Sequence, residues 1–189
     1  MEHEGSDANE TFMDFIRKDK GGPLRGKLTE SQVILENEPD VSRLHSKGFY
    51  GKIREKKLYL NFLEALYLME KEKIEVEYQG RILTFSELME FARSEAEFEV
   101  RYFVYKDLRD KGLIVKTGFK YGCHFRVYRK GPEEHADYLV HVIPEKREFQ
   151  TYDIVKHCRL AHSVKKRMVF AFIDEEGDIT YYSVERMRM

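Results

Sequence analysis

The feature that most constrains the fold of this chain is a pattern that occurs once in each half of the sequence. In this pattern, short strand-like runs are grouped around helix-like segments. In the first half, short β-like runs separated by turn residues fill residues 26–60, and residues 61–73 then carry apolar side chains in helical spacing. Residues 74–85 follow as a hairpin, with Gln79 and Gly80 at its turn. This order predicts a small α+β unit.

A helix-start signal closes that first unit. Thr84 and Glu87 have the spacing of a capping box, in which each residue satisfies a backbone N–H of the other. A helix is therefore expected over residues 86–96, and the first unit would be complete near residue 95.

The second unit begins with a helix over residues 98–112, which Gly112 would end in a left-handed conformation. Its predicted apolar face is Val100, Phe103, Val104 and Leu108. A strand over 113–118 and a hairpin over 120–142 come next. A helix over 152–166 and a last hairpin over 167–184, turning at Gly177, complete the pattern.

The predicted fold class is therefore α+β, with two domains. Residues 1–25 are expected to be a flexible extension, residues 26–95 a small N-terminal α+β domain, and residues 96–189 a C-terminal domain with a mixed β-sheet flanked by helices.

Composition limits the class of protein. The 33 Lys and Arg residues balance 34 Asp and Glu residues, so net charge does not indicate a nucleic-acid partner. Two cysteines form neither a disulfide framework nor a zinc ligand set, which favours a reducing compartment. The sequence predicts neither a signal peptide nor a membrane span, and we expect a cytoplasmic protein.

Common catalytic motifs are absent. No serine lies in a glycine-flanked elbow, and no phosphate-binding glycine loop follows a strand. The pairs Cys123-His124 and His157-Cys158 could form a zinc site only if both met in space. Because adjacent residues of a strand point to opposite faces, we expect no metal site there.

A metal-free set of side chains remains, namely Tyr121, His135 and Lys166. Such a set can cleave RNA, because the 2'-hydroxyl beside a phosphodiester is an internal nucleophile. The protein need only accept its proton, protonate the leaving 5'-oxygen and stabilise the charge on phosphorus. Three residues are enough for these three tasks.

The motifs "KTGFKYGCHFRVYRKG", "HADYLV" and "RLAHSVKKRMVFAFIDEEGDITYY" together resemble the catalytic domain of the archaeal tRNA-splicing endonucleases, the tRNA-intron endonuclease family. The resemblance covers about residues 98–184. It implies that Tyr121 is the general base, His135 the general acid and Lys166 the transition-state stabiliser. It further implies 2',3'-cyclic phosphate and 5'-hydroxyl products, without a metal ion or other cofactor.

The chain departs from its relatives at His124, where they commonly carry Asp. If the strand were regular, Tyr121, Cys123 and Phe125 would share one face, and His124 and Arg126 the other. His124 is then expected to lie away from the reaction.

The family's substrate is precursor tRNA with a bulge-helix-bulge at each intron–exon junction, a shape that suits RNA recognition. Arg159 resembles an arginine that sandwiches a bulged base, and a continuous helix would place it on one face with Lys166, seven residues on. Arg126 and Lys165 are further candidate RNA contacts.

The resemblance also implies an oligomer, because the family docks an acidic loop into a neighbouring subunit. The corresponding residues here are Asp174, Glu175, Glu176 and Asp178. A homotetramer or homodimer is expected, and an assembly with a non-catalytic sister chain is the alternative.

Two other functions are compatible with parts of the pattern. The helix, strand and hairpin of the second half also resemble a winged-helix module that only binds nucleic acid, and a structural subunit of the same endonuclease would share the fold. Tyr121, His135 and Lys166 favour the enzyme, because a wing does not need them.

Overall fold

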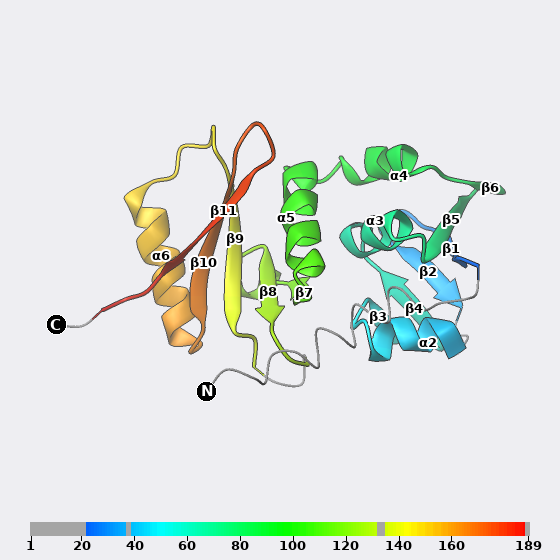
Figure 1. Ribbon diagram of the computed structural model, residues 1–189, viewed down its shortest axis with the longest axis horizontal. Helices are drawn as coiled ribbons and strands as arrows, with labels where there is room; N and C mark the ends of the chain where they lie inside the picture. Colours follow the sequence, from blue (N-terminus) through cyan, green and yellow to red (C-terminus); the bar gives the residue numbers. More distant parts are fainter. Residues whose placement is uncertain (1–21, 37–38, 132–134, 188–189) are drawn as a thin grey trace. The chain divides into compact units, whose positions relative to one another are not determined.

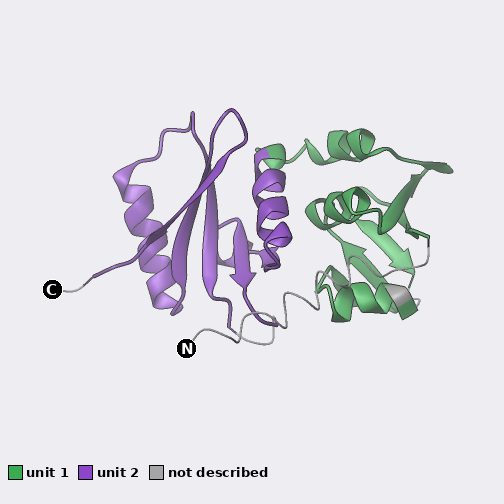
Figure 2. Ribbon diagram, viewed as in Figure 1, with its two compact units in different colours: residues 1–99 green, residues 100–189 purple. Residues whose placement is uncertain are grey.

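The computed structural model describes residues 22–36, 39–131 and 135–187 of the chain. The chain forms two compact units that divide between Glu99 and Val100 (Figure 2). Each unit has its own sheet (Figure 1). The α+β fold class predicted from the sequence is confirmed.

The N-terminal unit is built on a six-stranded sheet in the order β3-β4-β2-β1-β5-β6. Its strands are β1 (Leu24–Leu28), β2 (Val33–Glu36), β3 (Lys52–Arg54), β4 (Lys57–Leu60), β5 (Ile74–Tyr78) and β6 (Arg81–Ile82). Its helices are α2 (Pro39–Ser46), α3 (Phe62–Glu70) and α4 (Phe85–Ala92). Strands β1 and β5 pair in parallel, and the other paired neighbours are antiparallel.

Two predictions in this unit that depend on residues close in sequence, the capping box and the hairpin turn, are confirmed. The Thr84 hydroxyl accepts a hydrogen bond from the Glu87 amide, and the Glu87 carboxylate accepts one from the Thr84 amide. Gln79 and Gly80 both have positive φ, as the hairpin turn between β5 and β6 requires.

Two sequence interpretations in this unit are wrong. The helix α2 was missed, although Pro39 occupies its first position and Val41 and Leu44 are buried three residues apart. The β-like runs expected across residues 26–60 do not include residues 48–51, because Phe49 (φ 56°) and Gly51 (φ 63°) are left-handed and interrupt an extended backbone, so that β3 begins only at Lys52.

The C-terminal unit contains a five-stranded mixed sheet in the order β11-β10-β9-β8-β7. Its elements are α5 (Phe98–Asp110), β7 (Ile114–Thr117), the 3-10 turn η1 (Phe119–Tyr121), β8 (Phe125–Tyr128), β9 (Tyr138–Pro144), α6 (Thr151–Ser163), β10 (Arg167–Ile173) and β11 (Ile179–Val184). Strands β9 and β10 are parallel and joined through α6, whereas the other pairs are antiparallel. This crossover does not match a winged helix, where a small hairpin flanks a helical core.

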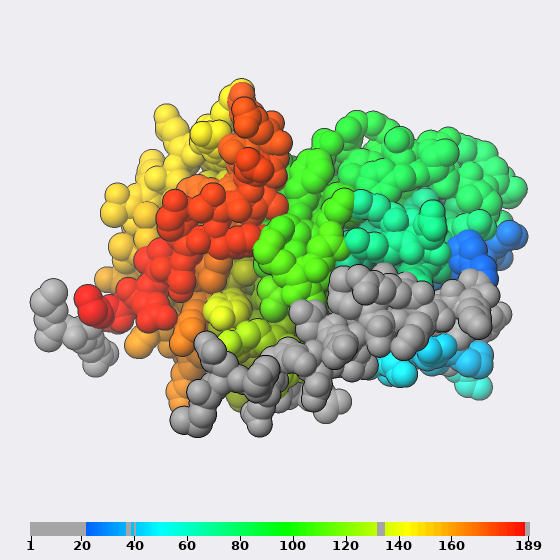
Figure 3. Space-filling view, viewed as in Figure 1, coloured from blue at the N-terminus to red at the C-terminus, as the bar shows by residue number. Residues whose placement is uncertain are grey.

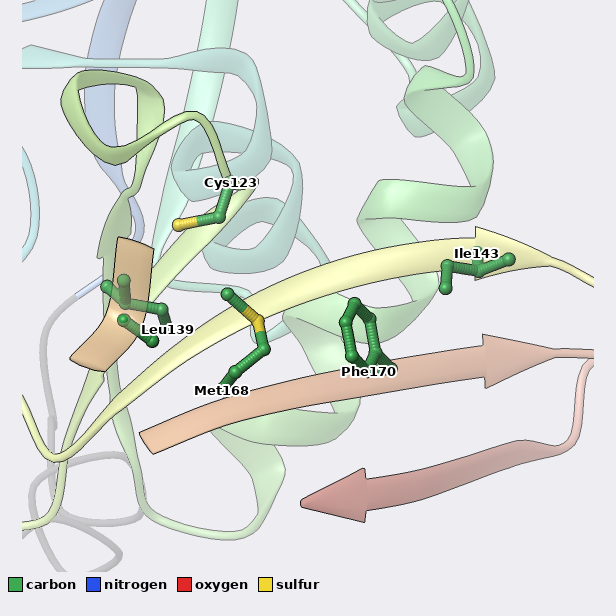
Figure 4. Packing of buried hydrophobic residues seen from close by; sticks show 6 residues of the cluster. Cys123, Leu139, Ile143, Met168 and Phe170 are labelled. Atoms are coloured by element: carbon green, nitrogen blue, oxygen red, sulfur yellow. The ribbon is translucent and has the colours of Figure 1, made fainter. Parts of the chain in front are cut away.

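The two helices lie on opposite faces of this sheet (Figure 1). On the α6 face, a cluster of buried residues comprises Cys123, Leu139, Ile143, Ala161, Met168 and Phe170 (Figure 4). On the α5 face, the ring of Tyr105 lies 6.0 Å from that of Phe125. The mixed sheet with a helix before and after its hairpin agrees with the prediction.

The inner face of α5 differs from the predicted one. Val104 and Leu108 are buried as expected, but Phe103 is exposed, and Tyr102 and Tyr105 are buried instead. The alternation of aromatic residues along α5 does not tell which rings face the sheet. Gly112 follows the helix with φ 78°, as predicted.

Strand β11 forms one edge of the C-terminal sheet (red in Figure 3), and its residues Thr180, Tyr182 and Ser183 are exposed. Across the described residues, no helix combines the length and apolar character needed to cross a membrane.

Candidate active site

The parallel pairing of β9 and β10 brings together the segments that precede them. Arg167 pairs with Tyr138, so the residues just before both strands lie at the same edge of the sheet. The Arg167 amide donates to the Asp137 carbonyl over 3.2 Å. Lys166 Nζ donates to the carbonyl oxygen of Ala136 over 3.3 Å. Lys166 therefore contacts the residue next to His135, which is itself exposed.

The chain reversal after α6 directs Lys166 toward β9. The helix ends at Ser163, Lys165 is left-handed with φ 55°, and the Lys166 amide donates to the Ala161 carbonyl over 2.9 Å. The interpretation of one continuous helix face shared by Arg159 and Lys166 is wrong, because Lys166 lies beyond the helix. Lys165 is exposed, whereas Lys166 is half-buried.

Tyr121 lies in the 3-10 turn η1 and not in a strand, contrary to the sequence interpretation. Its amide donates to the Gly118 carbonyl over 2.7 Å, and Gly122 follows in a left-handed conformation with φ 57°. Tyr121 packs against the cluster that includes Leu139 and Ala161. It thus reaches the α6 face of the sheet, whereas the side chain of Lys166 contacts Ala136.

The guanidinium group of Arg126 lies near the Tyr121 ring. The guanidinium carbon of Arg126 lies 5.7 Å from the ring centroid, and Arg126 Nε donates to the Thr117 carbonyl over 2.9 Å. This bond holds Arg126 close to the turn. The other candidate RNA contacts, Arg159 on α6 and Lys165 after it, are both exposed.

A pocket of about 290 Å³ opens beside Lys166, between the end of α6, the start of β10 and the end of β11. Four cations line it, namely Lys165, Lys166, Arg167 and Arg186. Its acidic residue is Glu185, whose carboxylate lies 3.5 Å from Arg167 Nε. The excess of positive charge suits a phosphate group. Arg167 and Arg186 were not predicted as site residues, because no pattern of neighbouring residues indicates that the start of β10 and the residues after β11 line one pocket.

Three histidines form a stack on the α6 face. The His141 ring lies 4.4 Å from that of His124 and 4.1 Å from that of His157, between centroids. His124 Nδ1 accepts a hydrogen bond from the Val142 amide over 2.9 Å. The stack was not predicted, since its members come from a loop, a strand and a helix.

The pKa values of the three imidazoles are all lowered, and burial is the largest cause for each. Burial, followed by the charges of Arg101 and Arg147, lowers the pKa of His124 to about 4. Burial, followed by the neighbouring imidazoles, lowers the pKa of His141 to about 3. Burial also lowers the pKa of His157.

The expectation that His124 lies on the face opposite Tyr121 is wrong, because the turn breaks the alternation of the strand. Both residues pack on the α6 side of the sheet. His124 is held there by its stacking and its hydrogen bond. Cys123 packs in the cluster instead, and the part of the chain that the structure describes contains no group of three or more His, Cys, Asp or Glu side chains arranged for a metal ion.

The acidic loop joins β10 to β11 and turns at Gly177, which has φ 89°. Asp174 Oδ1 accepts a hydrogen bond from the Asp178 amide over 2.8 Å, so Asp174 supports the turn itself. Glu175 pairs with Lys146, and Glu176 is exposed.

Comparison with known families identifies both units. Residues 24–89 match the model of the tRNA intron endonuclease N-terminal domain, and residues 98–181 match that of the tRNA intron endonuclease catalytic C-terminal domain. The chain belongs to the tRNA intron endonuclease family. The family resemblance recognised in the sequence motifs is thereby confirmed.

Individual members of the tRNA intron endonuclease family align over most of this chain. The tRNA-splicing endonuclease of Thermococcus kodakarensis is 46% identical over 159 residues, which are 84% of this chain and 95% of that protein. That of Thermococcus onnurineus is 43% identical over 164 residues, covering 86% and 96%. That of Methanothermobacter thermautotrophicus is 39% identical over 168 residues, covering 87% and 98%. These relatives are archaeal.

Proposed function

We propose that this protein cuts precursor tRNA at bulge-helix-bulge intron–exon junctions, by a transesterification that needs no metal ion. The observation that carries the proposal is the hydrogen bond from Lys166 Nζ to the Ala136 carbonyl. It holds a cation beside His135 within a domain that matches the family's catalytic model. The products would be a 2',3'-cyclic phosphate and a 5'-hydroxyl.

In the proposed reaction, the 2'-oxygen of the RNA attacks the adjacent phosphorus. Tyr121 accepts the 2'-hydroxyl proton as the general base. The new 2'-O–P bond closes the cyclic phosphate as the P–O5' bond breaks. His135 donates its proton to the departing 5'-oxygen, and its exposure leaves it accessible to RNA.

Lys166 is proposed to stabilise the negative charge that develops on the phosphate oxygens. A cation held before the reaction stabilises this charge without reorganising at the transition state. The pocket beside Lys166 extends the positive surface, which favours binding of a neighbouring phosphate. Arg159, Arg126 and Lys165 are proposed as further RNA contacts, and the unpaired cysteines Cys123 and Cys158 agree with action in the cytoplasm.

Two cleavages per precursor require two active sites, so we propose a homo-oligomer, either a dimer or a tetramer. The acidic loop would dock into a basic groove of another subunit. Because Asp174 supports the turn and Glu175 pairs within the chain, Glu176 and Asp178 are the residues that present charge to a partner. A non-catalytic sister chain is the alternative partner.

Cleavage of an end-labelled bulge-helix-bulge RNA in excess EDTA tests the chemistry. Wild-type protein should leave cyclic-phosphate ends, and His135→Ala, Tyr121→Phe and Lys166→Ala should each cut at least 100-fold more slowly, as about 10²–10⁴-fold is typical of a lost proton-transfer group. The matched controls are Tyr152→Phe and Lys156→Ala, exposed residues at the start of α6. Cleavage that requires added metal, or full activity of His135→Ala, would contradict the mechanism.

A further inference from the structure

Phe119 is the most exposed of the large apolar side chains that the structure describes, at 86%. Burying a phenylalanine contributes about 1.5–3 kcal/mol to folding, a stabilisation that the isolated chain forgoes here. The ring stands two residues before Tyr121, which packs inward. One short turn therefore presents an aromatic ring to solvent directly beside the proposed active site.

The turn that carries Phe119 is tightly braced. A Cβ on Gly118 would lie 2.5 Å from Cys123 Sγ and 2.9 Å from the Phe125 backbone nitrogen, so the two sides of the turn are in close contact. The Phe119 carbonyl accepts from the Gly122 amide over 3.0 Å. The exposed position of Phe119 is thus set by its backbone and does not depend on a loose loop.

The surroundings of Phe119 carry positive charge. Residues 113–131 contain no Asp or Glu, although acidic residues slightly outnumber basic ones in the whole chain. Their cations are Lys116, Lys120, Arg126, Arg129 and Lys130. Of these, Lys120 adjoins Phe119 and Arg126 is bonded to the Thr117 carbonyl, whereas Arg129 follows the far end of β8 and is paired with Asp137. A partner that covers Phe119 must therefore offer both negative charge and a flat apolar face, and a single-stranded nucleotide has both.

We propose that Phe119 is a base-stacking residue, on which a nucleobase of the bulge stacks beside the cleaved phosphodiester. The inference rests on the proposed function, because it names the residue that would contact a base of the same RNA beside the proposed active site. Lys120 and Arg126 accompany the adjoining phosphates, while the ring holds the unpaired base. A bulge supplies such a base, whereas a continuous duplex keeps its bases stacked on each other.

The chain contains no tryptophan, so Phe119→Trp introduces a single tryptophan, whose fluorescence can be excited apart from that of the tyrosines. We expect its fluorescence to be quenched on titration with a bulge-helix-bulge RNA that carries 2'-deoxynucleotides at the cleaved positions. A duplex of the same length without bulges should not quench it. The matched control is Phe91→Trp, at a half-exposed phenylalanine of the N-terminal unit, which should remain unchanged with either RNA.

Kinetics with cleavable RNA give the second measurement. Phe119→Ala should raise KM about 5- to 100-fold, as expected for one lost base–aromatic stack, with kcat much less affected. Phe119→Tyr should restore the wild-type KM, because its ring stacks equally well. Since the side chain is exposed, thermal melting of Phe119→Ala should match that of the wild type.

These outcomes separate the inference from the proposed chemistry. Quenching of the Phe119→Trp variant by bulged RNA, without cleavage by the wild type, would support the stacking role and contradict the proposed reaction. Cleavage by the wild type, with unchanged fluorescence of Phe119→Trp and a normal KM for Phe119→Ala, would overturn the stacking role alone. A changed oligomeric state of Phe119→Ala, with unchanged RNA binding, would also overturn it and assign the ring to a protein interface.

Discussion

The Tyr181 hydroxyl donates a 2.6 Å hydrogen bond to Asp107 Oδ2 and thereby joins the edge strand β11 to helix α5. Burial, together with this bond and the charge of Asp107, raises the pKa of Tyr181 above that of a free tyrosine. The hydroxyl therefore stays protonated and continues to donate. Asp107 is also paired with Lys111, the residue that follows α5.

Tyr181→Phe should lower the free energy of unfolding of the C-terminal unit by about 1.5–3 kcal/mol, the usual range for a hydrogen bond to a charged acceptor. Urea unfolding measures the change. Tyr182→Phe, at the exposed neighbouring position, is the matched control and should have no effect. Equal stability of the two variants would show that the bond is energetically neutral.

The histidine stack predicts loss of stability in mild acid. An unfolded histidine has a pKa of about 6.5, and the folded pKa values of His124 and His141 lie near 4 and 3. The folded protein thus binds fewer protons than the unfolded chain below pH 6.5. Stability is complete above that pH and decreases as the pH falls toward 4.

His141→Phe keeps a stacking ring but removes one titrating group. Between pH 6.5 and 5, the loss of unfolding free energy per pH unit should become smaller by up to about 1.4 kcal/mol. Urea unfolding at several pH values measures this slope. The control is His162→Gln, at an exposed histidine, and a slope unchanged by both variants would show that the stack does not control acid stability.

Gly118 is required by the close approach of the two sides of the turn that carries Tyr121. Gly118→Ala should destabilise the C-terminal unit by about 1–3 kcal/mol, as overpacking does, because its Cβ would meet backbone atoms of Cys123 and Phe125 at 2.9 Å. Cleavage should also slow as Tyr121 shifts. Gly22→Ala, which meets nothing within 4 Å, is the control in thermal melting and RNA cleavage.

Lys165 has a left-handed backbone, so the stability of variants at this position should follow how readily each residue adopts that conformation. Lys165→Val should destabilise the chain by about 1 kcal/mol or more, and Lys165→Gly should be at least as stable as the wild type. Thermal melting distinguishes the two. Equal melting temperatures would indicate that the reversal before Lys166 tolerates either conformation.

Charge reversal at the acidic loop tests the proposed assembly. Glu176→Lys should shift the sedimentation of the protein toward smaller species, because it removes an exposed negative charge without touching the turn. The effect should increase at low salt, where exposed charges are least screened. Glu30→Lys, an exposed acid in the N-terminal unit, is the control and should sediment as the wild type.

Features that depend on neighbours in sequence could be predicted, and those that depend on distant contacts could not. The capping box of Thr84 and Glu87 and the glycine that ends α5 were recognised because their partners lie within a few residues. The period-two pattern around Tyr121 was misread, since Gly122 ends a turn whose shape depends on packing against Cys123 and α6.

The same limit applies within the candidate site. The roles of the three candidates, Tyr121, His135 and Lys166, were taken from the family resemblance, and no local pattern indicated that Lys166 would contact Ala136. The histidine stack was missed for the same reason, because His124, His141 and His157 meet only when the sheet and α6 are assembled.

The parallel pairing of β9 with β10 has a consequence for the order of synthesis. Lys166 and Ala136 are 30 residues apart, and the contact between them depends on a strand that ends at Ile173. A nascent chain that stops before β10 holds Tyr121 and His135 but lacks the strand that fixes the Lys166 cation against Ala136, the residue after His135. Premature products of translation should therefore be unable to cut RNA. Nuclease activity should arise only once the catalytic domain has been synthesised almost completely.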